Sequence, residues 1–310
     1  MSRYHVNALL LVLCLGLVGL LSACAATPAQ SASPPSRMIE TTDLAQVADT
    51  ALKLAGQVGA DHVLVVFDLD NTLLAMEQGL GSDQWYDWQK AISTADPCDP
   101  IVVVDRLAVQ GALYFASAMR LTQADAPAQV RKLQEHGLKV IILTSRGDDF
   151  RLQTFRELRR GGFSFYASAF GPPGGYAETF MTTPDSRPVR YEDGVFLTAG
   201  QHKGEMLQAL LNKTLTPWPA VIVMADDKAG NLQAVLGAFA GSATSVQAFR
   251  YGGEDATVAA FDHAEAVRQW NLVEPDLRGL QAQFGADNYD LPAASAKTAC
   301  SAVSPRTVAQ

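Results

Sequence analysis

The chain has 310 residues, of which 48% are hydrophobic and 18% are charged, and its formal net charge is −8. This length and composition are typical of a globular protein with one large domain or two small ones. The negative charge and the absence of a run of Lys and Arg exclude the basic surface of a nucleic-acid-binding protein, so we expect no nucleic-acid partner. A small anionic substrate is not excluded, because a metal ion or a lysine at the site outweighs the more distant negative charges of the protein.

Residues 1–23 have the layout of a secretory signal peptide. Arg3 and His5 precede an apolar stretch over residues 8–21, and the stretch ends in Leu21-Ser22-Ala23-Cys24. This ending resembles a bacterial lipobox, which implies that Cys24 is lipidated and anchors the protein to a membrane of the bacterial cell envelope. In a Gram-negative host we expect the outer membrane, on the periplasmic side. A plain signal peptide or an N-terminal anchor is the alternative, although the stretch is short for a membrane span.

The rest of the chain divides into a tether, a domain and a tail. Residues 24–40 are Pro-rich with small side chains, and we predict that they form a flexible tether. Residues 41–285 form the predicted domain. Residues 286–310 are rich in Ala and Ser and are predicted to be a poorly ordered tail.

Two cysteines remain once Cys14 is removed with the signal and Cys24 is lipidated. Cys98 and Cys300 can pair in an oxidising compartment. The sequence does not decide whether they do.

Helices and apolar strands are predicted in alternation along the domain. Helical periodicity covers residues 42–57, 126–136, 150–160 and 203–211. Apolar strands are predicted over residues 63–67, 139–143, 221–224 and 245–251, with a hairpin near 190–196. We expect Thr41 or Thr42 to cap the first helix. This alternation predicts an α/β fold, a Rossmann-like parallel sheet with helices on both faces.

Residues 74–125 separate the first two predicted strands, which is more than one crossover needs. We predict that they form a mostly helical cap inserted after the first strand. This segment holds five aromatic residues, Trp85, Tyr86, Trp88, Tyr114 and Phe115. The first three either line a substrate pocket or pack a core. A second long connection includes residues 171–195, to which the sequence assigns no role.

Four polar motifs fall at element boundaries where parallel strands deliver side chains to one edge of the sheet. They are Asp68-Leu69-Asp70-Asn71-Thr72, Leu143-Thr144-Ser145-Arg146, Lys203 at a helix start, and Met224-Ala225-Asp226-Asp227. Burying paired carboxylates is costly unless a cation or hydrogen-bond donors compensate them. Taken singly, each motif has a structural alternative: a turn, a helix cap or a solvated lysine.

In this order, over about residues 60–232, the motifs resemble those of the haloacid dehalogenase-like (HAD-like) phosphohydrolases. Two further segments are similar to an uncharacterised branch of bacterial secreted proteins and lipoproteins in that superfamily, which implies no substrate. They are Gly81-Ser82-Asp83-Gln84-Trp85 and Tyr191-Glu192-Asp193-Gly194-Val195.

The motifs and this resemblance imply a phosphatase that acts on a small phosphorylated metabolite. Asp68 is the expected nucleophile, which forms an aspartyl-phosphate, and Asp70 is the expected acid and base. The groups expected to contact the phosphoryl group are Thr144, Ser145, Arg146 and Lys203. Arg146 has a structural salt bridge as its alternative role.

The carboxylates form an all-oxygen site suited to Mg²⁺. The resemblance implies three ligands, a carboxylate oxygen of Asp68, the main-chain carbonyl of Asp70 and the carboxylate of Asp226. Asp227 would support the site through a bound water or by orienting Lys203. The alternatives are a 5′-nucleotidase or phosphotransferase of the same fold, or an inactive binding lipoprotein at the envelope.

Overall fold

The computed structural model describes residues 33–284. Its helices are α2 (Leu44–Val58), α3 (Asp83–Ala95), α4 (Arg106–Ala116), α5 (Ala126–Glu135), α6 (Arg151–Arg160), α7 (Lys203–Lys213), α8 (Ala229–Ala238), α9 (Asp255–Ala259) and α10 (His263–Phe284). Its strands are β1 (Arg37–Thr41), β2 (Val63–Phe67), β3 (Leu74–Met76), β4 (Met119–Leu121), β5 (Lys139–Thr144), β6 (Arg190–Glu192), β7 (Val195–Leu197), β8 (Val221–Asp226) and β9 (Ser245–Tyr251).

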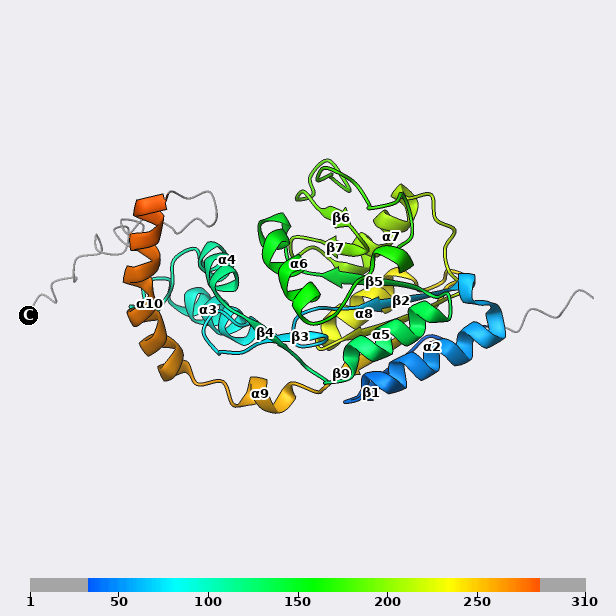
Figure 1. Cartoon of the computed structure of the whole chain (residues 1–310), viewed down its shortest axis with the longest axis horizontal. Coiled ribbons are helices and arrows are strands. Elements are labelled where there is room, and N and C mark those ends of the chain that lie inside the picture. Colours follow the sequence, from blue (N-terminus) through cyan, green and yellow to red (C-terminus); the bar gives the residue numbers. More distant parts are fainter. Residues whose placement is uncertain (1–32, 285–310) are drawn as a thin grey trace, which may run out of the picture. The chain divides into compact units, whose positions relative to one another are not determined.

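Seven strands form one sheet in the order β1-β9-β8-β2-β5-β7-β6 (Figure 1). Neighbouring strands are parallel except β6 and β7, which form the predicted hairpin. Asp193 and Gly194 make its two-residue turn with φ of 47° and 79°, the conformation for which an Asp-Gly pair is favoured. The predicted α/β fold with a mostly parallel sheet is confirmed.

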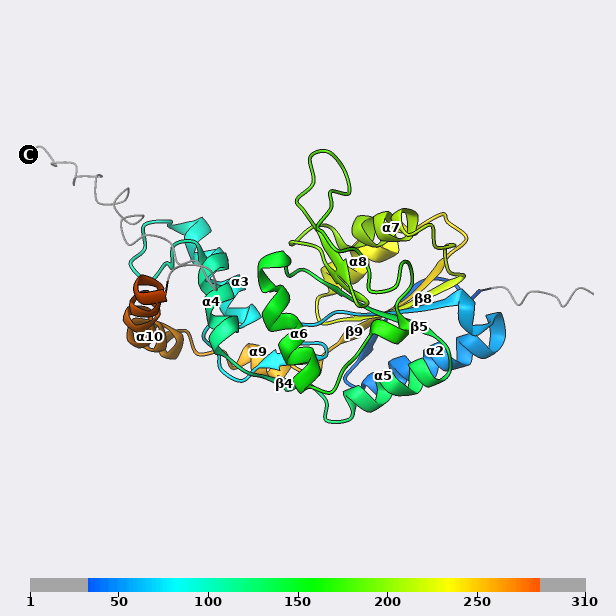
Figure 2. The same cartoon turned by 45° about the horizontal axis from the view of Figure 1, so that its top comes forward.

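Helices cover both faces of this sheet, so its strands are apolar on both sides. Val63, Val65 and Phe67 of β2 join one core with α2 and α5. Leu64 and Val66, which point the other way, join a second core with α7 and α8. Figures 1 and 2 show these two pairs of helices on opposite faces.

The direction of winding reverses at β2. From β2 the chain moves to β5 and β7 on one side, and it then returns to β8 and β9 on the other. Open α/β sheets bind ligands beyond the carboxyl ends of the strands at such a point. The ends of β2, β5 and β8 place Asp68, Thr144 and Asp226 there.

The region inserted after β2 combines helices with a small sheet that we did not predict. β3 and β4 pair antiparallel, and α3 and α4 lie between them along the chain. Trp85 of α3, Leu113 of α4 and Trp270 of α10 belong to one separate apolar core. The inserted helices are therefore completed by a helix from much later in the sequence, which lies beside them in both views (Figures 1 and 2).

Two details differ from the sequence analysis. Residues Arg37–Thr41, expected to end the tether and begin the domain, form edge strand β1, paired with β9. The cap of α2 is Asp43, whose Oδ1 accepts a hydrogen bond from Ala45 N at 2.8 Å, rather than Thr41 or Thr42. The hydrogen bonds of an edge strand come from a distant segment, so the local composition did not show them.

Several predictions concern residues outside the described range: the signal peptide, Cys24, the tail and Cys300. Cys98 is disulfide-bonded. The sequence left open whether Cys98 pairs with Cys300, and Cys300 lies outside the described residues. Within residues 33–284, no helix has the length and apolar composition needed to cross a membrane.

Helices α7 and α8 pack so closely that Gly204 has no room for a side chain. A Cβ at this position would lie 2.3 Å from the carbonyl oxygen of Ala234 and 2.7 Å from Cβ of Ala238. We expect Gly204→Ala to lower the free energy of unfolding by about 1–3 kcal/mol, because overpacking outweighs the gain in helix propensity. Urea denaturation measures the change.

Gly237→Ala in α8 is the matched control, since a Cβ there meets no atom within 4 Å. We expect this change to leave the free energy of unfolding unaltered or to raise it by up to about 1 kcal/mol. Equal losses at both positions would contradict the packing argument.

Candidate active site

Asp68 lies directly beyond the end of β2 and is 6% exposed. Its N–H donates to the carbonyl of Ala225 in β8 at 2.9 Å, so the pairing of β2 with β8 continues to this residue. The chain then turns tightly, with Asn71 at a φ of 56°, a left-handed conformation that Asn tolerates better than most residues. The turn leads into β3, and it leaves Asp68 and Asp70 at the strand end.

Asp226 ends β8 and is completely buried. Its Oδ1 accepts hydrogen bonds from the N–H of Lys228 at 2.8 Å and from Nδ2 of Asn231 at 2.9 Å. The second Asn231 contact, to Oδ2, is 3.1 Å. Asn231 therefore orients the acidic motif from the first turn of α8.

Lys203 is the first residue of α7 and is 2% exposed. Its Nζ lies 2.6 Å from Oδ1 of Asp68 and 2.6 Å from Oδ2 of Asp226. Burial lowers the pKa of this ammonium group, but Asp226 and Asp68 raise it by more, so the lysine stays charged. The Lys203 side chain thus links Asp68 of the first motif to Asp226 of the fourth, as expected.

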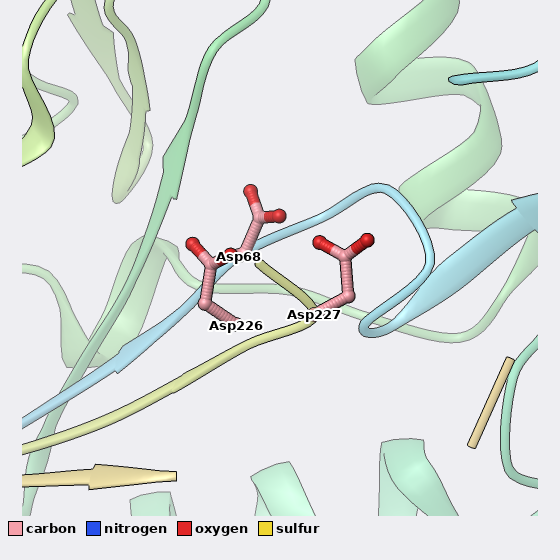
Figure 3. A group of neighbouring side chains, drawn as sticks. All are labelled: Asp68, Asp226 and Asp227. Atoms are coloured by element: carbon pink, nitrogen blue, oxygen red, sulfur yellow. The ribbon is translucent and has the colours of Figure 1, made fainter. Parts of the chain in front are cut away.

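Asp68, Asp226 and Asp227 form a compact acidic cluster (Figure 3). One carboxylate oxygen of each lies within 4.8 Å of the others. Burial raises the pKa of Asp68 to about 7, with Lys203 lowering it and Asp226 raising it further. Burial and the charges of Asp68 and Asp226 raise the pKa of Asp227 to about 9. The cluster is a possible metal site of three Asp residues.

Two observations fit a cation at this cluster. Oδ1 of Asp227 is buried and has no hydrogen-bond partner among the described residues. Carboxylates also outnumber cations there within residues 33–284. The carboxylates that interact are Asp68, Asp70, Asp83, Asp87, Asp226 and Asp227. The cations beside them are Arg146, Lys203, Lys228 and Arg250, and Arg250 is also paired with Asp255. A hard divalent ion would supply the missing charge and bind the free oxygen.

The carboxylate of Asp70 is bound by Arg146. Nε and Nη2 of Arg146 donate to Oδ2 and Oδ1 of Asp70 at 2.9 and 2.7 Å, and Nη1 donates to Thr154 at 2.8 Å. Burial raises the pKa of Asp70, but Arg146 and the hydroxyl of Tyr114 lower it by more, so the net shift is downward. All three guanidinium nitrogens of Arg146 are thus engaged by Asp70 and Thr154, and its contact with a phosphoryl group stays a prediction. The structural salt bridge is the role observed.

Thr144 and Ser145 follow β5 on the other side of β2. Thr144 is 1% exposed, and its Oγ1 accepts a hydrogen bond from the N–H of Arg146 at 3.2 Å. The hydroxyl proton of Thr144 is thereby left to donate elsewhere. Ser145 is exposed, and its carbonyl accepts from the N–H of Gly200 at 2.7 Å. Both residues lie at the strand-end edge, as the sequence predicted.

Comparison with known proteins places the chain in a family. A family model described as "Protein of unknown function (DUF2608)" matches residues 40–284. The chain belongs to the DUF2608 family. The match runs from β1 to the last residue of α10, so the DUF2608 domain includes the acidic cluster, Lys203 and the inserted region. A search of curated proteins found no match. The parallel sheet and acidic cluster of this DUF2608 domain are consistent with the HAD-like resemblance.

Three residues at the site of the DUF2608 domain were not predicted from the sequence. Tyr114 of α4 donates its hydroxyl to Oδ1 of Asp70 at 2.8 Å. Nζ of Lys228 lies 2.6 Å from Asp83 at the start of α3. Lys228 follows the fourth motif directly, which was an available signal. Asp83 lies in a segment that carries the family resemblance, but no role followed from it, and Tyr114 had no such signal. Only the fold brings the inserted helices to the strand ends.

The inserted aromatic residues of the DUF2608 domain mainly form structure. Trp85 is 1% exposed in the core shared with α10, and the ring of Trp88 stacks on His263 with centroids 4.7 Å apart. A cavity of about 510 Å³ is lined by Met76–Leu80, Gln84, Arg120 and residues of α9, α10 and the link between them, and by none of the acidic cluster. Of these aromatic residues, Tyr114 is the one that bonds a predicted catalytic residue.

We expect a divalent cation such as Mg²⁺ to raise the melting temperature of the protein. An ion that binds only the folded state raises the free energy of unfolding by about 2.7 kcal/mol when its concentration is 100 times its Kd. Differential scanning fluorimetry with Mg²⁺ and with EDTA measures this shift. Asp227→Asn should reduce it, whereas Asp61→Asn, an exposed change at the other end of β2, should preserve it. A shift of equal size in the Asp227→Asn variant would exclude Asp227 as a ligand.

Proposed function

We propose that this protein is a Mg²⁺-dependent phosphatase that hydrolyses a small phosphomonoester through an aspartyl-phosphate on Asp68. The observation that carries the proposal is the environment of Asp68. It lies at the switch point of the sheet, 2.6 Å from a buried lysine and beside two more carboxylates, one with a free buried oxygen. A nucleophile, an adjacent fixed cation and a cation site are the parts that phosphoryl transfer requires.

The reaction would have two steps on one face of Asp68. In the first, an oxygen of Asp68 attacks phosphorus and the bond to the leaving oxygen breaks. The protonated form of Asp70, a minority because Arg146 and Tyr114 lower its pKa, gives its proton to that oxygen. In the second, water attacks phosphorus, Asp70 accepts the proton of the water, and inorganic phosphate leaves with Asp68 restored. Asp70 follows Asp68 by two residues, which gives it access to both the leaving group and the water.

Asp68, Asp226 and Asp227 would hold Mg²⁺, which when bound supplies positive charge to the phosphoryl oxygens. The main-chain carbonyl of Asp70 is a further candidate ligand. Lys203 would stabilise charge that builds up on the same oxygens, and the free hydroxyl proton of Thr144 would donate to one of them. Such fixed donors require no reorganisation during the reaction.

The substrate proposed is a small phosphorylated metabolite, because helices of the inserted region contact the site through Tyr114 and Asp83. An extended polymer would have to displace them. We further propose that the enzyme works at the bacterial cell envelope, held there by a lipid on Cys24. This part rests on the sequence of residues 1–24, and retention of a Cys24→Ser variant in the membrane fraction would contradict it.

Phosphate release from a panel of phosphomonoesters tests the function. We expect release by the purified protein with Mg²⁺, and loss of release with EDTA that Mg²⁺ restores. The panel should include an aryl phosphate, sugar phosphates and 5′-nucleotides, because the pattern of rates also separates a general phosphatase from a nucleotidase. No release above that of the Asp68→Asn variant from any compound would contradict the proposal.

A further inference from the structure

Tyr114 reaches the site from outside the four motifs. It lies in α4 of the inserted region, is 4% exposed, and donates its hydroxyl to Oδ1 of Asp70 at 2.8 Å. The guanidinium of Arg146, which clamps the same carboxylate, lies over the Tyr114 ring with Cζ 4.4 Å from its centroid. Tyr114, Arg146 and Asp70 thus form one contact group.

The hydrogen bonds to Asp70 are distributed unequally between its two oxygens. Within the described part of the chain, Oδ1 accepts from Tyr114 and from Nη2 of Arg146, while Oδ2 accepts only from Nε of Arg146. Each carboxylate oxygen has about two acceptor positions. Oδ1 is therefore saturated, and Oδ2 keeps one position for proton exchange.

Helix α6 fixes the end of α4 that carries Tyr114. The guanidinium of Arg156 donates to the carbonyls of Tyr114, Phe115 and Ser117 at 2.9, 2.6 and 2.7 Å. The side-chain amide of Gln153 donates to the carbonyl of Gly111 at 3.2 Å. Because α6 follows the second motif directly, these bonds couple the position of the Tyr114 hydroxyl to the strand end that carries Arg146.

We propose that Tyr114, together with Arg146, is a positioning residue that orients Asp70 so that Oδ2 exchanges the proton with the leaving group and the water. This inference rests on the proposed function, and it assigns part of the catalytic apparatus to the inserted region. Tyr114 bonds Oδ1, and Arg146 bonds both oxygens through Nη2 and Nε, so both residues act through Asp70 and need not touch the substrate.

The leaving group provides a test that a structural role would not pass. Proton donation matters most for poor leaving groups, because a good one departs as the anion. We expect Tyr114→Phe to lower kcat/KM for an alkyl phosphate by about tenfold or more, and kcat/KM for p-nitrophenyl phosphate by less than about threefold. The melting temperature and its rise with Mg²⁺ should stay near the wild-type values.

Tyr86→Phe is the matched control. It also removes one hydroxyl from the inserted region, and that hydroxyl makes no hydrogen bond with a described residue; the ring contacts Arg106. We expect it to leave both rates unchanged. Equal losses of kcat/KM for both substrates in Tyr114→Phe, or no loss for either, would overturn the inference while leaving the phosphatase intact. Failure of the wild type to hydrolyse either ester would instead refute the proposed function, and the inference with it.

Discussion

The variant Asp68→Asn is expected to lose turnover of every phosphomonoester by about 10⁴-fold or more. An amide cannot act as the nucleophile. Asp226 also lies 2.6 Å from Lys203, but it ends β8 and accepts hydrogen bonds from Lys228 and Asn231. The side chain keeps its shape, so the fold should persist. The raised pKa of Asp68 shows that the negative charge of this side chain is costly to bury. Steady-state phosphate release measures the loss of turnover, and a thermal melt measures whether the fold persists.

Asp61→Asn makes the same chemical change at the exposed start of β2, next to the same strand. We expect its turnover to stay within about twofold of wild type and its stability within about 0.5 kcal/mol. Residual turnover of Asp68→Asn within tenfold of wild type would mean that another group attacks phosphorus, and Asp68 would then be at most a ligand.

Lys203→Met is expected to damage both catalysis and stability. The methionine removes an ammonium group that lies 2.6 Å from both Asp68 and Asp226, and it leaves two buried carboxylates without their shared cation. We expect kcat to fall about 10²–10³-fold, the usual effect of losing one fixed transition-state donor. In EDTA the free energy of unfolding should fall by about 3–5 kcal/mol, because breaking a buried pair leaves uncompensated charge.

The same variant should recover part of its stability in Mg²⁺, since a bound cation replaces the lost charge. Urea denaturation with EDTA and with Mg²⁺ measures this difference. Lys213 lies at the exposed end of the same helix and contacts the rings of Tyr176 and Phe180. Lys213→Met should lower the free energy of unfolding by less than about 1 kcal/mol under both conditions. An equal loss with and without Mg²⁺ in Lys203→Met would argue against a cation at the acidic cluster.

Much of the fold was predictable because its strands are buried on both faces. Such strands are continuous apolar runs, and the strand predicted over residues 245–251 has the observed bounds of β9. The strand-end positions of Asp68, Thr144 and Asp226 followed from the rule that parallel strands deliver side chains to one edge. The helix start at Lys203 was predictable in the same way.

The remainder depends on contacts between distant segments. β1 exists through its pairing with β9, and the edge of a sheet has no strong local signal. The pairing of Arg146 with Asp70 and the approach of Tyr114 join residues far apart in the sequence. Composition and spacing identified these residues as polar or aromatic, but only the packing of α4 against α6 determines which atoms meet.

Trapping the covalent intermediate tests the central claim most directly. Wild-type protein is quenched in acid during turnover of an aryl phosphate with Mg²⁺, reduced with borohydride, and digested for peptide mass spectrometry. Because borohydride reduces an acyl phosphate to an alcohol, we predict a reduced side chain at position 68 that is absent without substrate. Turnover without any reduction at Asp68, or reduction at Asp226 or Asp227 instead, would contradict the account.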